Sequence, residues 1–160
     1  MRYDNDVIQV GIGDIKIVRR EEQLTAILGS CIAIIIVDPL NKKTACAHCQ
    51  LPKGPIKFDL TTKKGRFVDQ AIPAMLAMLR TTAEHYSKLK VFVVGGGSMA
   101  DLGDQLVGQR NLNQAVAVLE KLRLPFVMLS TGGSIGRQIT MTNGDDGPVV
   151  KPIERLKDIS

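Results

Sequence analysis

Short apolar runs, separated by glycine, proline and charged residues, dominate the first half of the chain. Alternating apolar and polar positions predict half-buried strands, and continuous runs of about four to eight apolar residues predict fully buried strands. The run from Cys31 to Val37 is of the second kind, and Asp38-Pro39 ends it with a turn. Further strands are expected over 7–10, 14–18 and 44–51, whereas the apolar segment 24–28 is ambiguous.

The second half of the chain changes to a helical period. From Phe67 to about His85 the apolar residues fall on one helical face, and Pro73 lies inside the pattern, so the helix is expected to start or bend there. A second amphipathic helix is marked by Leu112, Ala115, Val116, Leu119 and Leu122. Short strands are expected over 91–94, 125–129, 137–142 and 148–151, and a mobile loop over 53–65. We therefore predict an α+β fold of packed mixed or antiparallel sheets with two main helices.

Length and composition favour a single globular domain over residues 1–160. The chain is 44% hydrophobic and 23% charged, which is ordinary for a globular protein. Its apolar runs are too short to span a membrane, and its start lacks a basic region followed by an apolar one. We therefore expect a cytoplasmic protein without membrane insertion.

The charge of the chain is a weak argument for a nucleic-acid partner. The 21 basic and 16 acidic residues give a net charge of +5, but the basic residues are scattered. With no tryptophan and few other aromatic residues, a base-stacking platform is difficult to build. We expect no nucleic-acid binding, while the charge is compatible with an acidic protein partner.

Cys31 is the candidate nucleophile. Three cysteines in a cytoplasmic chain argue against a disulfide framework, so free thiols are expected. Cys31 follows Gly29-Ser30, and glycine permits the close approach or unusual torsions that a nucleophile at a turn requires. Backbone amides around Ser30 and Cys31 are then candidates for holding an oxyanion. The thiol pKa is expected to fall below its usual value of about 8.5 beside an imidazolium.

His48 is the candidate base, because His85 lies near a helix end and is interpreted as a surface residue. His48 lies in a strand of mostly small, apolar residues, where an imidazole needs a polar partner. The residues alone leave a catalytic base and a satisfied core histidine both open. Zinc binding by Cys46, His48 and Cys49 is disfavoured, because on a strand Cys49 points away from the other two.

Two glycine-rich segments raise the alternative of a nucleotide-binding domain. Gly11-Ile12-Gly13 begins like a dinucleotide-binding fingerprint, but Lys16 stands where that motif has its third glycine. The glycine-rich segment 95–98 follows a strand, but the Gly-Lys-Ser/Thr sequence that completes a phosphate-binding loop does not come after it. We interpret these glycines as turn and packing residues.

Several segments, taken in order, resemble the CheD family of chemoreceptor glutamine deamidases over roughly residues 13–151. The most specific are Gly29-Ser30-Cys31 and His48 with Leu51-Pro52, in which the cysteine and histidine are 17 positions apart. The others are 67–73, 95–99, 108–111 and 132–137.

The resemblance implies a Cys–His–Thr triad, which maps onto Cys31, His48 and Thr25. Thr25 is then expected to accept a hydrogen bond from the imidazole. The family resemblance also implies a fold similar to the catalytic domain of cytotoxic necrotizing factor deamidases. The implied activity is cofactor-free hydrolysis of glutamine side chains in receptor helices to glutamate and ammonia, with receptor methylesterase activity as a side reaction. One departure is Cys49, which stands where the family usually has a bulky apolar residue.

The substrate and the partners are less firmly indicated. The family resemblance implies CheC, a phosphatase of the phosphorylated response regulator, as a partner, so a weakly catalytic regulator of CheC is the alternative function. A thiol hydrolase acting on another amide is also open, because a triad fixes the reaction and not the substrate. Polar residues in glycine-rich settings are expected either to line the substrate cleft or to serve as turn and cap residues: Gln109, Arg110, Asn111, Ser134 and Arg137.

Overall fold

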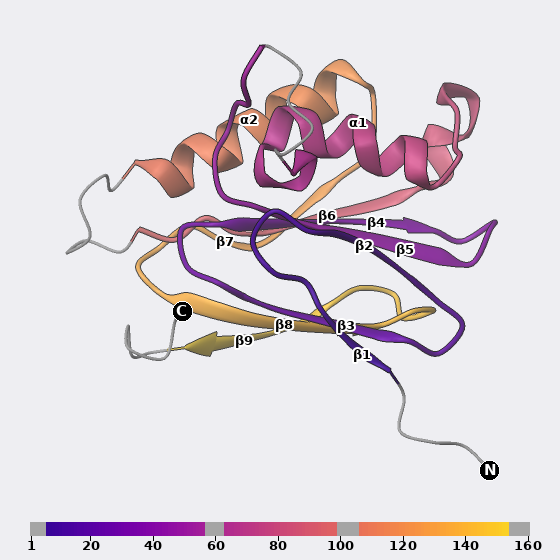
Figure 1. Ribbon diagram of the computed structural model, residues 1–160, viewed down its shortest axis with the longest axis horizontal. Coiled ribbons are helices and arrows are strands. Elements are labelled where there is room, and N and C mark those ends of the chain that lie inside the picture. The colour runs from indigo at the N-terminus through magenta and orange to yellow at the C-terminus, as the bar shows by residue number, and fades with distance from the viewer. Residues whose placement is uncertain (1–5, 57–62, 99–105, 154–160) are drawn as a thin grey trace.

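The computed structural model describes residues 6–56, 63–98 and 106–153, which form two β-sheets and a layer of helices. Figure 1 shows helices α1 (Val68–Met78) and α2 (Val107–Lys121) on one face of the five-stranded sheet and the four-stranded sheet on its other face. The strands are β1 (Val7–Gln9), β2 (Ile15–Arg19), β3 (Gln23–Leu28), β4 (Ile32–Asp38), β5 (Lys43–Cys49), β6 (Lys90–Gly95), β7 (Val127–Thr131), β8 (Gly136–Thr142) and β9 (Val149–Ile153). Two short 3-10 helices, η1 (Lys64–Arg66) and η2 (Ala83–Lys88), complete the described elements.

Both sheets are mixed. The strand order is β1-β3-β8-β9 in the four-stranded sheet and β2-β5-β4-β6-β7 in the five-stranded sheet. β1 pairs with β3 and β6 with β7 in parallel, and the other pairs are antiparallel. The predicted α+β class with packed sheets and two main helices is confirmed.

Strand β4 lies at the centre of the molecule, which explains its uninterrupted apolar sequence. All seven of its residues are buried, because one face packs against the helices and the other against the four-stranded sheet. Ile32, Ile34 and Ile36 belong to the helix-facing core, whereas Ala33 and Ile35 belong to the core between the sheets. A strand covered on both faces needs no polar alternation.

Helix α2 begins in direct contact with the glycine turn, Gly95–Gly97, at the end of β6. A Cβ atom added to Gly108 would lie 2.5 Å from the carbonyl oxygens of both Gly96 and Gly97. A Cβ atom added to Gly96 would lie 2.6 Å from the Leu112 side chain. Glycine at 96 and 108 therefore lets the first turns of α2 approach the main chain next to β4.

The structure defines three elements that the sequence left open or bounded differently. The ambiguous segment 24–28 is strand β3. The strands on either side of Gly11-Ile12-Gly13 belong to different sheets, and the chain crosses between them with Gly13 at φ 87°. Helix α1 starts before Pro73 and ends at Met78, so the region of His85 is the separate 3-10 helix η2.

Of the expected mobile loop 53–65, residues 57–62 lie outside the described residues. Among the helices that the structure describes, none has both the length and the apolar character needed to cross a membrane.

Candidate active site at Cys31 and His48

The structure brings Cys31 and His48 onto one face of the five-stranded sheet. Ala33 of β4 is the direct partner of His48 in β5, and Cys31 lies two residues before Ala33. Cys31 and Ala33 both belong to the core between the sheets. Cys31 and His48 are therefore diagonal neighbours on adjacent strands, an arrangement whose Cβ atoms lie about 7 Å apart or less. Their exposed fractions are 8% and 4%.

The hydrogen bond of the imidazole fixes its tautomer. Nδ1 of His48 lies 2.8 Å from the carbonyl oxygen of Val10. A carbonyl oxygen only accepts, so Nδ1 carries the proton and donates it. Nε2 is then a lone-pair acceptor, and this buried atom has no hydrogen-bond partner among the described residues. The hydrogen bond to Val10 thus orients the imidazole and leaves Nε2, its basic nitrogen, without a hydrogen-bond partner among the described residues.

Val10, rather than Thr25, is the group that orients His48, which corrects the expectation for the threonine hydroxyl. Leu24 and Ala26 of β3 face the core between the sheets, so Thr25, at the intervening position, points to the other face of its sheet. Its connection to the base is through the main chain, because the Val10 N–H donates to the Thr25 carbonyl at 2.9 Å. A main-chain acceptor leaves no signature in a sequence, which explains why Val10 was missed.

Burial keeps both groups neutral in the resting protein. It raises the pKa of the Cys31 thiol to about 11, contrary to the lowered value expected from the sequence. Burial also lowers the pKa of His48, and the hydrogen bond to Val10 offsets this only in part. Desolvation disfavours the charged form of each group. At neutral pH the pair is therefore a thiol and an imidazole, not a thiolate and an imidazolium.

The nucleophile turn, Gly29–Cys31, rests on the glycine turn. The N–H of Gly96 donates to the Cys31 carbonyl at 2.9 Å, and the N–H of Gly97 donates to the Gly29 carbonyl at 3.0 Å. Gly95 has φ 103°, and a Cβ atom there would lie 2.6 Å from the Cys31 carbonyl oxygen. The glycines after β6 thus serve close packing under the nucleophile, in agreement with their interpretation as turn and packing residues.

Asn111 of α2 is buried beneath the same turn. Its Nδ2 donates to the Ser30 carbonyl at 3.2 Å and to the Gln50 carbonyl at 3.0 Å. Its Oδ1 is buried and unpartnered among the described residues. Asn111 therefore connects the residue before Cys31 to the strand end that carries His48.

Arg137 is also an internal residue rather than an exposed cleft residue. Its guanidinium donates to the carbonyl oxygens of Gly132 at 2.6 Å and Ile135 at 3.3 Å, and its Nε donates to Ser130 Oγ at 2.9 Å. Burial lowers the pKa of this guanidinium. Arg137 thus holds the loop that follows β7.

Gln109, Arg110 and Ser134 are exposed. Ser134 belongs to the loop held by Arg137, and that loop reaches the glycine turn because the Gly132 N–H donates to the Gly95 carbonyl at 2.9 Å. Gln109 and Arg110 lie in the first turn of α2. A role of these three residues in a substrate cleft stays a prediction.

The other two cysteines are buried on opposite faces of β5. Cys46 belongs to the core between the sheets and Cys49 to the helix-facing core, as strand alternation predicts. Burial raises the pKa of Cys46 to about 12 and that of Cys49 well above its usual value. All three thiols are free. Within the described ranges, no three metal-binding side chains of His, Cys, Asp or Glu come together.

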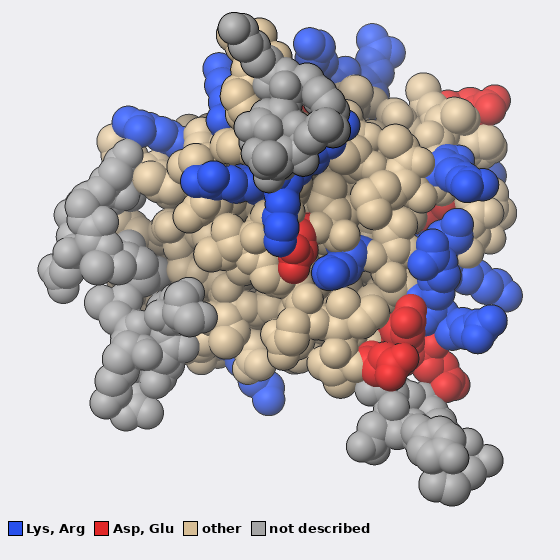
Figure 2. Space-filling view, in the orientation of Figure 1, with Lys and Arg blue, Asp and Glu red and all other residues tan. Residues whose placement is uncertain are grey.

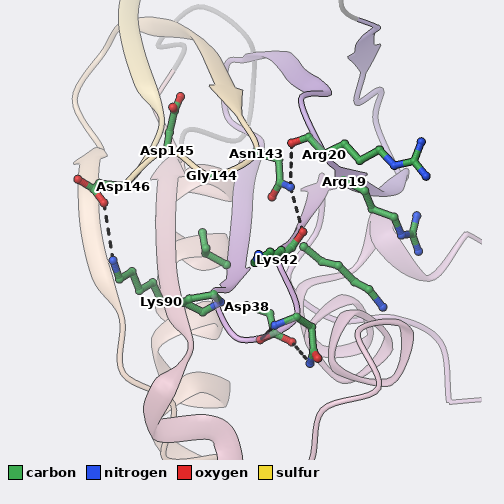
Figure 3. A pocket seen from close by; sticks show the side chains of 13 residues that line it. Arg19, Arg20, Asp38, Lys42, Lys90, Asn143, Gly144, Asp145 and Asp146 are labelled. Carbon is green, nitrogen blue, oxygen red and sulfur yellow. Dashed lines mark hydrogen bonds and ion pairs between the residues drawn. The ribbon is translucent and has the colours of Figure 1, made fainter.

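A cavity of about 670 Å³ lies at the other end of β4 and does not include Cys31 or His48. It is bounded by the turns near Arg20, Lys42 and Asn143. Figure 3 shows Asn143 between the main chains of the other two turns, donating to the Arg20 carbonyl at 3.2 Å and to the Lys42 carbonyl at 3.0 Å. Figure 2 shows lysine and arginine side chains scattered over the visible face, near its centre as well as at its edges, rather than in one continuous stripe. Nothing in this cavity contributes to the Cys31 site.

Curated proteins from bacteria and archaea are similar to the chain over most of its length. A protein of Bdellovibrio bacteriovorus, named probable chemoreceptor glutamine deamidase CheD, is 40% identical over 147 residues, which cover 89% of this chain and 92% of the relative. The chemoreceptor glutamine deamidase CheD of Halalkalibacterium halodurans is 31% identical over 140 residues, or 84% and 86% of the two chains. A probable chemoreceptor glutamine deamidase CheD of Methanococcus maripaludis strain C6 is 30% identical over 155 residues, or 96% and 99%.

The family described as CheD chemotactic sensory transduction matches residues 50–151. This segment contains Asn111, Arg137 and the glycine turn, while Cys31 and His48 precede it. The alignment to the Methanococcus protein spans 96% of the chain and so includes both. The family match and the extent of these similarities show that the chain belongs to the CheD family.

Proposed function

We propose that the protein is a cytoplasmic chemoreceptor glutamine deamidase, with Cys31 as nucleophile and His48 as general base. The observation that carries the proposal is the state of His48: Nδ1 is committed to Val10, and Nε2 has its lone pair unused on the sheet face that carries Cys31. The names of the similar proteins supply the substrate class, a glutamine side chain of a chemoreceptor.

The reaction begins with transfer of the Cys31 thiol proton to Nε2 of His48 as the sulfur attacks the carboxamide carbon. A C–S bond forms, and the carbonyl oxygen becomes an oxyanion that backbone N–H groups of the nucleophile turn stabilise. When the oxyanion collapses, His48 returns the proton to the departing nitrogen, so ammonia leaves and a thioester remains. His48 then takes a proton from water as the water oxygen attacks the thioester. When the C–S bond breaks, His48 returns that proton to the Cys31 sulfur, so glutamate is released and the thiol and the neutral imidazole are restored.

The neutral resting pair suits this order of steps. Because the thiol holds its proton up to about pH 11, deprotonation must accompany attack rather than precede it. A neutral imidazole with a lowered pKa is available as a base over the physiological range. Charge therefore develops mainly in the transition state, where oriented N–H groups stabilise it most.

Ammonia release from a receptor cytoplasmic fragment tests the proposal, together with the mass change that accompanies conversion of glutamine to glutamate. Cys31→Ala should abolish both signals. Cys49→Ala is the matched control, since it removes a buried thiol on the opposite face of β5 and should keep turnover. Full activity of Cys31→Ala would contradict the assignment of the nucleophile.

Four finer expectations remain predictions. Methylesterase activity on receptor glutamate esters should depend on Cys31 as deamidation does, because both substrates present the same acyl carbon. Binding to CheC is tested by titrating it into the deamidation assay, where competition indicates a shared surface. A fold similar to cytotoxic necrotizing factor deamidases and a single domain over residues 1–160 are tested by an experimental structure.

A further inference from the structure

Asn111 contacts both segments that carry the proposed catalytic groups. Its side chain is fully buried, and its Nδ2 lies 3.2 Å from the carbonyl oxygen of Ser30 and 3.0 Å from that of Gln50. Ser30 immediately precedes Cys31, and Gln50 follows His48 by two residues. One amide group on α2 therefore fixes the ends of two adjacent strands relative to each other.

The orientation of the Asn111 amide is dictated by its surroundings. Both neighbours are carbonyl oxygens, so only the NH₂ group can face them, and a flipped amide would place Oδ1 against two other oxygen atoms. The orientation leaves Oδ1 buried without a partner among the described residues. A buried unsatisfied acceptor is unfavourable, and such groups in folded proteins call for an explanation. A role of the amide in the site supplies one.

The hydrogen bond to Ser30 determines the direction of the Cys31 N–H. The two groups belong to one peptide unit, and in a trans peptide the C=O and N–H point in opposite directions. No cis peptide is present in the described chain. Because Asn111 holds the Ser30 carbonyl toward α2, the N–H of Cys31 points away from the helix. That N–H has no backbone acceptor among the described residues.

An unpaired N–H on the nucleophile itself is the donor that a developing oxyanion needs. Helix α2, which carries Asn111, packs directly against the glycine turn. Gly108, three residues before it, allows α2 to touch the carbonyl groups of Gly96 and Gly97. Gly96 in turn donates to the Cys31 carbonyl. The peptide units on both sides of Cys31 are thus held, while its own N–H is left for substrate.

We propose that Asn111 is a positioning residue for the oxyanion donor. It acts through the Ser30–Cys31 peptide to aim the Cys31 N–H at the substrate oxygen, and through Gln50 to keep the His48 strand in place. The inference rests on the proposed function only in taking Cys31 as the nucleophile.

Two reactions of Cys31 separate this role from simple support of the fold. Acylation by 4-nitrophenyl acetate passes through a tetrahedral oxyanion, whereas alkylation by iodoacetamide displaces iodide from a saturated carbon and forms none. In Asn111→Leu, we expect acylation to slow by about 100-fold or more, as when an oxyanion donor is lost. Alkylation at about pH 9 should stay within about threefold of the wild-type rate, because it follows the thiolate fraction.

Asn113→Leu is the matched control, since it makes the same change at an exposed position of α2, where Asn113 Oδ1 accepts a hydrogen bond from Gln109 Nε2. It should leave both rates unchanged. If Asn111→Leu fails to fold by circular dichroism, Asn111→Asp carries the test. Its side chain has the same shape, and a carboxylate has no donor, so the same selective loss is expected. In deamidation the loss should fall on kcat, with KM unchanged.

Equal slowing of acylation and alkylation would overturn the proposal, because a structural role predicts it. Unchanged acylation in both Asn111 variants would also overturn it, as would a wild-type protein that is alkylated at Cys31 but not acylated. These probes need no receptor, so the outcome is independent of substrate. The two proposals can also fail separately. If the Asn111 variants lose acylation selectively but the wild-type protein releases no ammonia from receptor, the role of Asn111 is supported and the proposed deamidase function is refuted.

Discussion

The pH dependence of Cys31 alkylation distinguishes a neutral resting pair from a preformed ion pair. Burial raises the thiol pKa to about 11, compared with a reference value of 9.0 for an exposed cysteine, near the upper end of the usual range. At pH 8, a pKa of about 11 leaves about 0.1% of the thiol ionised, against about 10% at a pKa of 9. The alkylation rate should therefore be about 100-fold below that of an ordinary cysteine. The rate should rise about tenfold for each pH unit from pH 7 to pH 10.

The assay is the rate of iodoacetamide incorporation at Cys31, followed by mass spectrometry at each pH, with Cys31→Ala supplying the background from the other thiols. Restricted access of the reagent lowers all rates by the same factor, so the slope reports ionisation alone. His48→Ala should leave the profile nearly unchanged, because no imidazolium stabilises the thiolate at rest.

An ion pair would behave differently, since a thiolate held by an imidazolium reacts at a constant rate from mildly acidic pH upward. A plateau below pH 8 that disappears in His48→Ala would therefore refute the account of burial and of the proton-coupled attack.

The remaining predictions concern residues around Cys31 and His48 and the turns at the other end of β4. Thr25→Val should reduce kcat less than about tenfold while His48→Ala reduces it by about 100-fold or more, because the imidazole makes its hydrogen bond to Val10 and none to the Thr25 hydroxyl; equal losses would restore the threonine to the triad. Gly108→Ala should destabilise the protein by about 1–3 kcal/mol in urea unfolding, because its Cβ meets main-chain oxygens that cannot yield; an unchanged midpoint would contradict this packing. Lowering the pH below His48's ordinary pKa of 6.5 should reduce the free energy of unfolding, because the unfolded state binds the proton more tightly; His48→Gln should flatten that dependence. Asn143→Ala should cost about 2–3 kcal/mol, since it removes three side-chain hydrogen bonds, from Thr44 and to Arg20 and Lys42. Asn41→Ala, whose side-chain hydrogen bond stays within one turn, is its control and should cost less.

Structure could be predicted from the sequence where the type of a residue depends directly on its burial or on the strand face that it occupies. The run from Cys31 to Val37 identified the central strand because full burial removes all polar alternation. The opposite faces of Cys46 and Cys49 followed from strand geometry in the same way. Spacing and family resemblance singled out Cys31 and His48, which the register then placed on one face.

The groups that support the pair were less predictable, because their roles depend on contacts between distant segments. The acceptor for His48 is a main-chain carbonyl at Val10, and any residue type can supply a carbonyl. Asn111 was recognised as a polar residue near the site, but only the docking of α2 shows that it is buried under the nucleophile turn. The orientation of Thr25 depended on which face of β3 meets the other sheet.

The hydrogen bonds of Asn111 also have a consequence for the order in which activity is gained during folding. Cys31 immediately precedes β4 and His48 lies in its antiparallel neighbour β5, so a local hairpin is enough to bring them together. The Asn111 contact with Ser30 spans 81 positions and needs helix α2 in place. We therefore expect a partly folded chain to present its thiol beside its imidazole before it can hydrolyse an amide. In a newly made chain, hydrolytic activity would thus report completed docking of α2 rather than formation of the hairpin.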